Sequence, residues 1–441
     1  MSPALRQVLV LLTALAASPC SDSAGASGGS GRTGTAGPRD RDVPDGALVA
    51  SSFEQLAAWI ADPEGPPEIW LRPGTYRGDL AVKRPVSIHG AGGAILEGTG
   101  AASVVTIAAS DVTLDNLQIR HSGRRNTTED AGVKATGERV RIADVSIEDT
   151  LFGASLEQCR HCVLEGVRVE GFGDDAELRG DGIKLWESHD SVVRGCVAEH
   201  VRDVVVWYTR RALVEGNVVR HSRYGTHFMY AHDSIARNNH VEDDVVGIFV
   251  MYSARLTIEG NVLAGARGAA GMGLGFKESD AVRVRGNWLV ANTTGVYLDY
   301  TPRTPADPAV FEGNVFALND VALRLHSAER GAIFHANDFR DNAETVTVDG
   351  GGDALACDVR GNHFSDYEGY DLDGDGVGDV PYRVSALSSE LADEHPALQF
   401  FHGTAAMQLV DAIAHAIPVL DGRTILADAA PRVRAPEVAL P

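Results

Sequence analysis

An asparagine that returns at a short and nearly regular interval is the feature of this sequence that most restricts its fold. Seven segments share one frame, of which "LVEGNVVRH" and "RVRGNWLVA" are examples, and their asparagines stand at positions 217, 239, 261, 287, 314, 337 and 362. Successive members are 22 to 27 residues apart. A repeat of this length predicts a solenoid, because one unit alone cannot bury its apolar face and must stack on the next.

Each repeat consists of short strands separated by turns. Segments such as "GIKLWES", "THFMYAH" and "GIFVMYS" lie between the asparagine frames and alternate in polarity, with Gly, Asn and Asp at their ends. Leucine-rich repeats require a Leu-x-x-Leu-x-Leu frame that is absent here, and propeller blades need about 40 residues. The sequence therefore predicts an all-β fold, a right-handed parallel β-helix in which the asparagines stack as a ladder in one turn.

The segments outside the repeat predict the organisation of the chain. Residues 1–20 have one arginine, a short apolar run and then small residues, which is typical of an export signal rather than a membrane span. Cys20 then opens a Gly/Ser-rich tether, residues 21–46, of the kind that follows a lipidated cysteine. We expect the β-helix over residues 47–403, beginning with a cap helix in "FEQLAAWI" that covers exposed strand edges.

The expected C-terminal part is a helix over residues 404–420, followed by a loose tail over residues 421–441. Apolar residues in "TAAMQLVDAIAHAIPVL" recur at helical spacing, which predicts either a cap on the last rung or a docking helix.

The charge and the cysteines narrow the functional classes. A net charge of −22 argues against a nucleic-acid partner and fits an extracytoplasmic protein or one that handles cations. Cys159 and Cys162 form a Cys-x-x-Cys motif, but no second pair completes a zinc pattern. We interpret the two as a short-range disulfide or as small core residues.

Alternation along each strand predicts which side chains face outward. Side chains of a strand point to opposite faces in turn, so the repeats, aligned on their glycines, give an inward column of Leu185, Val206, Phe228, Val250, Phe276 and Leu298. The outward column is then Trp186, Trp207, Met229, Met251, Lys277 and Asp299. Stacked rungs are about 4.8 Å apart, so Met229 and Met251 should be neighbours.

The two methionines suggest a site for a soft metal ion. The chain has only five methionines, and His227 shares the outward face of Met229. Thioethers beside an imidazole suit Cu(I) better than Zn(II) or Mg(II). Met272 is either a third thioether donor or a turn residue. The alternative is an apolar patch of Trp186, Trp207 and the methionines, buried under a loop or a partner.

Several of these stretches resemble one family. "RYGTHFMYAHDS", "VGIFVMYSARLTIEGNVL" and "DYEGYDLDGDGVGDVPYR" are similar to the NosD proteins of nitrous oxide reductase maturation, and the likeness runs from about residue 47 to 420. The resemblance implies a periplasmic or otherwise extracytoplasmic accessory protein that is not an enzyme. Its implied partners are an ABC transporter permease and ATPase, a copper-chaperone lipoprotein and nitrous oxide reductase. It carries the copper contact over to His227, Met229 and Met251, and leaves open whether the cargo is copper or a sulfur species.

An acidic loop near the C-terminus predicts a second metal site. "DLDGDGVGD" places Asp371, Asp373, Asp375 and Asp379 at positions 1, 3, 5 and 9 of an EF-hand-type calcium loop. Position 12 is Tyr382 instead of a bidentate glutamate. The loop is therefore either an incomplete calcium site or an acidic turn that closes the solenoid.

Two further functions compete with metal handling. Many β-helices act on acidic polysaccharides as lyases, epimerases or hydrolases, and acid–base pairs can be drawn from Asp174, Asp175, Asp181, His189, Asp190, His200 and Asp203. An acidic protein without a basic groove is poorly suited to polyuronates, however, and its outward column holds Trp and Met. The other alternative is a purely structural adaptor.

Overall fold

The computed structural model describes residues 36–173, 178–327, 329–349, 352–401, 404–416 and 422–436. The chain divides into two units, residues 1–33 and 34–441, and only the second is described. The expected export signal, Cys20 and residues 21–35 of the tether lie outside the described residues. Among the helices that are described, none combines the length and the apolar character needed to cross a membrane.

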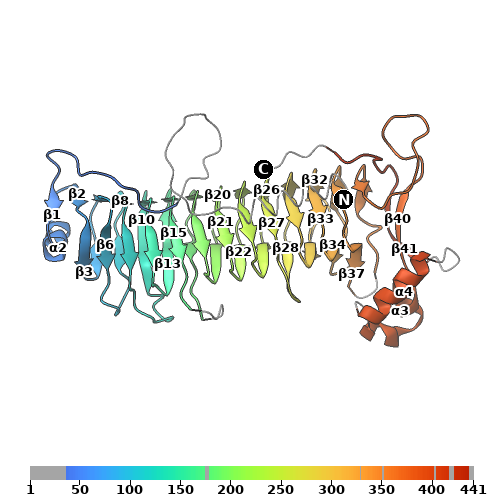
Figure 1. Cartoon of the computed structure of the whole chain (residues 1–441), viewed down its shortest axis with the longest axis horizontal. Coiled ribbons are helices and arrows are strands. Elements are labelled where there is room, and N and C mark those ends of the chain that lie inside the picture. Colours follow the sequence, from blue (N-terminus) through green and yellow to red (C-terminus); the bar gives the residue numbers. More distant parts are fainter. Residues whose placement is uncertain are drawn as a thin grey trace. The chain divides into compact units, whose positions relative to one another are not determined.

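The repeats wind into three parallel sheets (Figure 1). The first sheet, in spatial order, consists of β1 (Val49–Ala50), β2 (Glu68–Leu71), β5 (Val86–Gly90), β8 (Val112–Asp115), β11 (Arg141–Ala143), β14 (Val163–Glu165), β17 (Val192–Arg194), β20 (Leu213–Glu215), β23 (Ile235–Arg237), β26 (Thr257–Glu259), β29 (Arg283–Arg285), β32 (Ala309–Glu312), β35 (Ala332–His335) and β38 (Asp358–Arg360).

The second sheet follows the first around each coil. It consists of β3 (Gly74–Arg77), β6 (Ala94–Glu97), β9 (Gln118–Arg120), β12 (Ser146–Glu148), β15 (Arg168–Glu170), β18 (Val197–Glu199), β21 (Val218–Arg220), β24 (His240–Glu242), β27 (Val262–Ala264), β30 (Trp288–Val290), β33 (Val315–Ala317), β36 (Asp338–Arg340) and β39 (His363–Phe364).

The third sheet closes each coil. It consists of β4 (Leu80–Val82), β7 (Val105–Ala108), β10 (Ala131–Glu138), β13 (Phe152–Arg160), β16 (Ile183–Trp186), β19 (Asp203–Trp207), β22 (Tyr224–Met229), β25 (Val246–Met251), β28 (Met272–Lys277), β31 (Thr294–Asp299), β34 (Val321–Leu325) and β37 (Glu344–Val348). Each strand pairs in parallel with its counterpart one coil away, so the predicted parallel β-helix is confirmed.

The predicted asparagine ladder lies in the turn between the first and second sheets. The seven asparagines are at most 4% exposed. Asn239 is typical: its backbone N–H and its side-chain Nδ2 both donate to Oδ1 of Asn261, and Nδ2 also donates to the carbonyl of Val214. Because every buried amide of the turn is paired in this way, each rung fixes the register of the next.

The ladder ends on a residue that the sequence assigned to a loose tail. Residues 423–428 form β41 (Arg423–Asp428), which pairs antiparallel with β40 (Tyr382–Ala386). Asp428 is fully buried and accepts hydrogen bonds from the backbone N–H and Nδ2 of Asn362. The tail is ordered here because the last asparagine of the ladder would otherwise have no acceptor.

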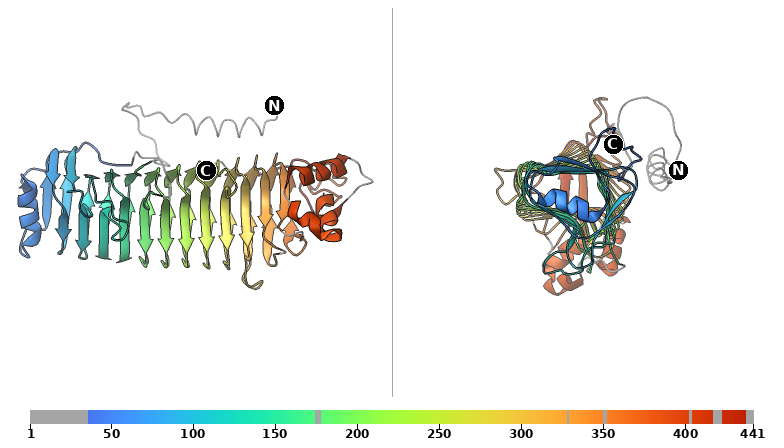
Figure 2. Two further views of the ribbon diagram at one scale, coloured as in Figure 1. Left: turned by 90° about the horizontal axis from the view of Figure 1, so that it is seen from below. Right: turned by 90° about the vertical axis from the view of Figure 1, so that its left-hand side faces the viewer.

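Helices and irregular segments cover both ends of the coils. Helix α2 (Phe53–Ala61) lies across the open end of the first coil, as predicted, and buries Leu56 and Ile60 (Figure 2, right). At the other end the coils stop at β39 rather than near residue 403. The following cap contains α3 (Leu387–Glu394), the 3-10 helix η1 (Pro396–Phe401) and α4 (Ala405–Ala416), of which only α4 was expected.

Two local predictions can be compared with the structure. Cys159 and Cys162 form a disulfide, with both residues fully buried, as one of the two interpretations expected. Residues 36–46, expected to belong to a flexible tether, instead contact the β-helix: the N–H of Gly37 donates to the carbonyl of Gly166, and that of Arg39 donates to Oδ1 of Asn116.

Candidate metal centre

The outer face of the third sheet carries the column predicted from strand alternation. The six inward residues from Leu185 to Leu298 are all fully buried. On the other face, Trp186 pairs in register with Trp207, Trp207 with Met229, and Met229 with Met251. The two methionines therefore lie on adjacent rungs, about 4.8 Å apart along the sheet.

His227 is the centre of this face, and both of its ring nitrogens have a neighbour. Its Nδ1 lies 3.3 Å from Nε1 of Trp207 on the preceding rung. Its Nε2 lies 3.2 Å from Sδ of Met251 on the following rung. The imidazole thus bridges the indole of one rung and a thioether two rungs further along.

Aromatic rings enclose His227, although it points away from the core of the β-helix. The residue is only 6% exposed. The ring centroid of Tyr224 lies 4.8 Å from that of the imidazole, the ring of Trp207 meets it edge-on at 5.5 Å, and Phe249 lies 6.0 Å away. This enclosure leaves little of the imidazole open to water.

The enclosure keeps the imidazole neutral. Burial lowers the pKa of His227 to about 4; the nearby Asp203 carboxylate opposes this shift, whereas the positive charge of Arg223 adds to it. Arg223 itself is fixed by two hydrogen bonds to Asp203, and its guanidinium lies 4.8 Å over the ring of Tyr224. A neutral imidazole can bind a metal ion at neutral pH with no net release of a proton to solvent.

The donor set fits a soft monovalent ion. A metal with bonds of about 2.0 Å to nitrogen and about 2.3 Å to sulfur holds the two donor atoms somewhat more than 3.5 Å apart. The His227–Met251 contact of 3.2 Å must therefore open by a few tenths of an ångström to admit the ion. Met229 is half-buried and pairs in register with Met251, so a second thioether lies on the adjacent rung. Two thioethers and one imidazole favour Cu(I) over harder ions.

Met272 does not join this group. An added Cβ on Gly275 would lie 2.7 Å from Sδ of Met272 and 2.4 Å from the ring of Phe249, so the sulfur and the ring fill the space that the glycine leaves open. In register, Phe249 separates Gly275 from His227. The sulfur of Met272 therefore lies over Gly275, one rung beyond Phe249 and two rungs beyond His227.

A row of tyrosines borders the methionine column. Tyr208, Tyr230 and Tyr252 directly follow Trp207, Met229 and Met251 in the sequence, and their rings stack with centroids 5.0 Å apart. All three have positive φ, between 49° and 52°, at the turn that leaves the third sheet. The doublets Trp-Tyr, Met-Tyr and Met-Tyr were the sequence signal from which this row could have been predicted.

The acidic loop brings three of its four aspartates together. Carboxylate oxygens of Asp371, Asp373 and Asp375 lie within 4.8 Å of one another. Asp379 turns back to accept the backbone N–H of Leu372. Tyr382, at position 12, is buried in the cap, where its hydroxyl contacts Asp366 and Thr345. Residues 371–379 thus resemble the first part of a calcium loop without its closing carboxylate.

Of the residues considered for sugar chemistry, Asp181 and Asp203 lie close together around Arg202, and the other described ones lie elsewhere on the coils. Asp174 and Asp175 are outside the described residues. Asp181, whose pKa burial raises to about 6, pairs with Arg202, while Asp203 pairs with Arg223. The other three lie at two different turns: His189 accepts the N–H of Arg210, Asp190 pairs with Arg211, and His200 contacts Glu170.

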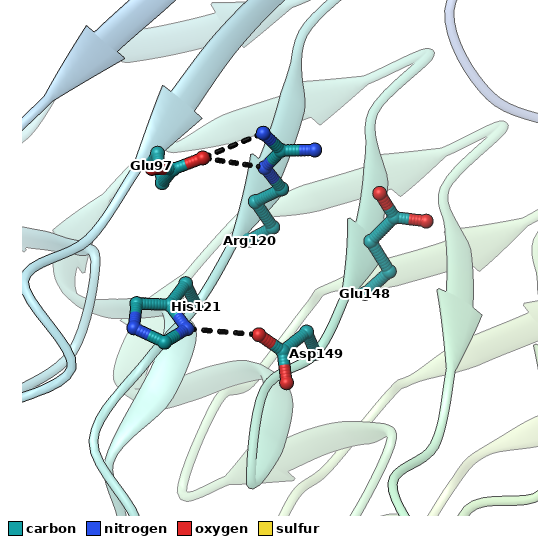
Figure 3. A pocket seen from close by; sticks show the side chains of 5 residues that line it. All are labelled: Glu97, Arg120, His121, Glu148 and Asp149. Atoms are coloured by element: carbon teal, nitrogen blue, oxygen red, sulfur yellow. Dashed lines mark hydrogen bonds and ion pairs between the residues drawn. The ribbon is translucent and has the colours of Figure 1, made fainter.

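A shallow cavity of about 420 Å³ lies elsewhere, where the second sheet ends (Figure 3). Its lining residues are Glu97, Arg120, His121, Glu148 and Asp149. Arg120 binds Glu97 and His121 binds Asp149, so most of its charges are already paired. None of the candidate metal ligands or sugar-processing residues named above lines this cavity.

Comparison with known proteins agrees with the resemblance seen in the sequence. Residues 165–369 match a family described as "Periplasmic copper-binding protein (NosD)". A Pseudomonas aeruginosa protein named "Probable ABC transporter binding protein NosD" is 28% identical over 85% of this chain and 92% of its own length. Its namesake from Stutzerimonas stutzeri is 24% identical over 81% of this chain and 85% of its own length.

Solved structures agree in fold. The mannuronan C-5 epimerase AlgE6 A-module of Azotobacter vinelandii superimposes with a TM-score of 0.51 at 15% identity, over 71% of this chain and 97% of that one. The catalytic unit of a GH87 α-1,3-glucanase from Streptomyces thermodiastaticus gives a TM-score of 0.52 at 16% identity, over 75% of this chain and 65% of the glucanase chain. At such identities the likeness concerns the β-helix fold and carries no activity with it.

Proposed function

Because the chain belongs to the NosD family of periplasmic copper-binding proteins, we propose that it holds Cu(I) at His227, Met229 and Met251 while the ion passes between partners. The ion is cargo in this proposal, and the β-helix performs no turnover. A thioether pair and one neutral imidazole bind Cu(I) without displacing protons. Such a site can load and release its ion under the same conditions.

The observation that carries the proposal is the contact between Nε2 of His227 and Sδ of Met251. These two side chains come from different rungs, yet their donor atoms lie 3.2 Å apart inside an aromatic enclosure. An apolar patch beneath a partner would explain exposed methionines, but it would not call for a buried imidazole aimed at a sulfur. Residues of this type in this geometry favour metal capture over simple packing.

The names of the relatives suggest which proteins this chain works with. Two of them are named as ABC transporter binding proteins, and we infer that this chain also associates with a transporter on the outer side of the membrane. We further propose that a copper chaperone loads the site and that nitrous oxide reductase receives the ion. The tyrosine row and Trp186, which is 41% exposed, form the surface that a partner must approach to reach Met229 and Met251.

A Cu(I) competition titration tests the proposal. Wild-type protein should bind one Cu(I) and take up Zn(II) much more weakly. Met229→Leu with Met251→Leu preserves volume and apolarity, so the protein should fold normally but bind Cu(I) at least tenfold more weakly. Met272→Leu is the matched control, because Phe249 separates that sulfur from His227, and it should bind like wild type. Equal affinity of the double variant and wild type would refute the copper site.

A further inference from the structure

The indole of Trp207 determines which nitrogen of His227 carries the proton. An indole N–H can only donate a hydrogen bond, and Nε1 of Trp207 lies 3.3 Å from Nδ1 of His227. Nδ1 must therefore accept. Since a neutral imidazole has one N–H, the proton resides on Nε2.

The position of this proton matters because Nε2 is the nitrogen that faces the thioether. The N–H on Nε2 points at Sδ of Met251, 3.2 Å away, and thioether sulfur is a weak acceptor. The lone pair that a metal ion needs is thus absent from the nitrogen next to the sulfur. The lone pair lies instead on Nδ1, where it accepts the hydrogen bond from the indole of Trp207.

From this arrangement we propose that Trp207 is a positioning residue that gates the copper site by holding His227 in the tautomer that cannot bind metal beside Met251. The inference rests on the proposed function for the identity of the ion, but the tautomer itself is a property of the metal-free protein. When Cu(I) enters, Nε2 loses its proton and Nδ1 gains one, through solvent exchange, so the imidazole remains neutral and no net proton is released.

The exchange breaks the Trp207 hydrogen bond, because Nδ1–H and Nε1–H are then both donors. Binding of Cu(I) at Nε2 therefore costs the buried hydrogen bond between Trp207 and Nδ1 of His227. The site binds its ion less tightly than the same three ligands would with an unconstrained imidazole. For a carrier this weakening is useful, since it favours transfer of the ion to a tighter acceptor.

Trp186 provides the matched control within the same column. Trp186 is also an outward tryptophan. It lies one rung before Trp207 and pairs with it in register. It lies beside Lys184, whose Nζ is 5.2 Å from its ring centroid. It is two rungs from His227, so Trp186→Phe changes the same kind of residue without touching the imidazole.

Nuclear magnetic resonance tests the gate before any metal is added. The chain has five tryptophans and therefore five indole N–H signals, and Trp207→Phe and Trp186→Phe assign the two that the test needs. Ring nitrogens of His227, assigned with His227→Gln, should show the proton on Nε2 in wild type and a shift toward Nδ1 in Trp207→Phe. A metal-free wild type with the proton on Nδ1 would overturn the proposal.

Addition of Cu(I), supplied as its acetonitrile complex without oxygen, gives the second test. The indole signal of Trp207 should move as its acceptor is lost, while that of Trp186 stays in place. Trp207→Phe should bind Cu(I) about fivefold more tightly than wild type, which corresponds to about 1 kcal/mol, whereas Trp186→Phe should match wild type. Unchanged or weaker binding by Trp207→Phe would mean that the indole only packs against the site or acts as a ligand.

The two proposals fail in distinguishable ways. If wild type binds no Cu(I), the proposed function is wrong, yet the metal-free spectra still decide whether Trp207 fixes the tautomer. If wild type binds Cu(I) with the Trp207 signal unmoved, the copper site stands and the gate is wrong.

Discussion

The asparagine turn and the outer face of the third sheet are built on the same coils, but they use repetition in opposite ways. In the turn, one residue type recurs through seven rungs, and each side-chain amide is paired with the next until the last one meets Asp428. On the outer face the corresponding residue changes from tryptophan to methionine to lysine within five rungs. The repeated part builds the scaffold, and the site lies where the repeat is broken.

The comparison predicts that the largest loss of stability comes from the turn. Oδ1 of Asn261 accepts two hydrogen bonds from Asn239, and its Nδ2 donates to Asn287 and to the carbonyl of Ala236. Asn261→Leu leaves several buried groups without partners, so the free energy of unfolding should fall by about 3 kcal/mol or more. Denaturant melts measure it.

A control for this experiment lies at the end of a second ladder. Oδ1 of Asn342 accepts two hydrogen bonds from Asn319 and its Nδ2 donates to the carbonyl of Phe316, but the residue is only half-buried. Because water can replace part of what is lost, Asn342→Leu should cost clearly less. Similar losses of unfolding free energy at both positions would show that burial in the ladder does not determine the cost of losing an asparagine.

Met229→Leu with Met251→Leu should leave the melt of the protein nearly unchanged, because those side chains belong to the variable face.

The acidic loop is another segment outside the repeat. Calcium binding there would be a second case of a site that lies where the repeat is broken. Should Asp371, Asp373 and Asp375 hold calcium, the ion stabilises the native state by about 2.7 kcal/mol at a concentration one hundred times its Kd. Calcium should then raise the Tm of wild type. Asp373→Ala with Asp375→Ala should abolish that increase. Identical melts of wild type in calcium and in chelator would leave the loop as an acidic turn.

A smaller effect is expected at Asp244, where the second ladder is imperfect. This ladder, between the second and third sheets, contains Asn292 and Asn319, whose Nδ2 groups donate to neighbouring rungs. Asp244 takes the equivalent place, accepts the N–H of Ser222 through Oδ1, and leaves its buried Oδ2 without a partner. Burial raises the pKa of this carboxyl well above its usual range.

The sign of the pH dependence at Asp244 follows from that shift. A folded-state pKa above the unfolded value means that the folded protein holds this proton more tightly than the unfolded chain. The stabilisation is complete at pH values below the ordinary pKa and is lost as pH rises through the folded pKa. Asp244→Asn should therefore raise stability at neutral pH by about 1 kcal/mol, with the gain shrinking as the pH is lowered. A gain independent of pH would mean that Asp244 is not held protonated.

Strand alternation and the asparagine frame were sufficient to predict the coils, the inward column and the outward placement of His227, Met229 and Met251. They were not sufficient for the enclosure of His227. The pairing of β19 with β22 shifts between Asp203 and Val205, so β22 has one extra residue there. This bulge returns Tyr224 to the outer face, against the expected alternation.

Strands β25 and β28 keep unbroken register with β22, so the effect of its extra residue is carried on to Met272. Its place in register matches Tyr224 and Val246, so strict alternation would direct it inward. Its sulfur instead lies over Gly275. The pairing of β41 with β40 was missed for a different reason: its partner lies about 40 residues away, and the segment has no asparagine frame to reveal it.

X-ray absorption at the copper edge of the Cu(I)-loaded protein tests the central claim most directly, because it counts the atoms bound to the ion. The site on the third sheet predicts one nitrogen at about 2.0 Å and two sulfurs at about 2.3 Å, with the sulfur contribution lost in Met229→Leu with Met251→Leu. A spectrum of nitrogen and oxygen neighbours without sulfur, or one unchanged in the double variant, would contradict the assignment of copper to the break in the repeat.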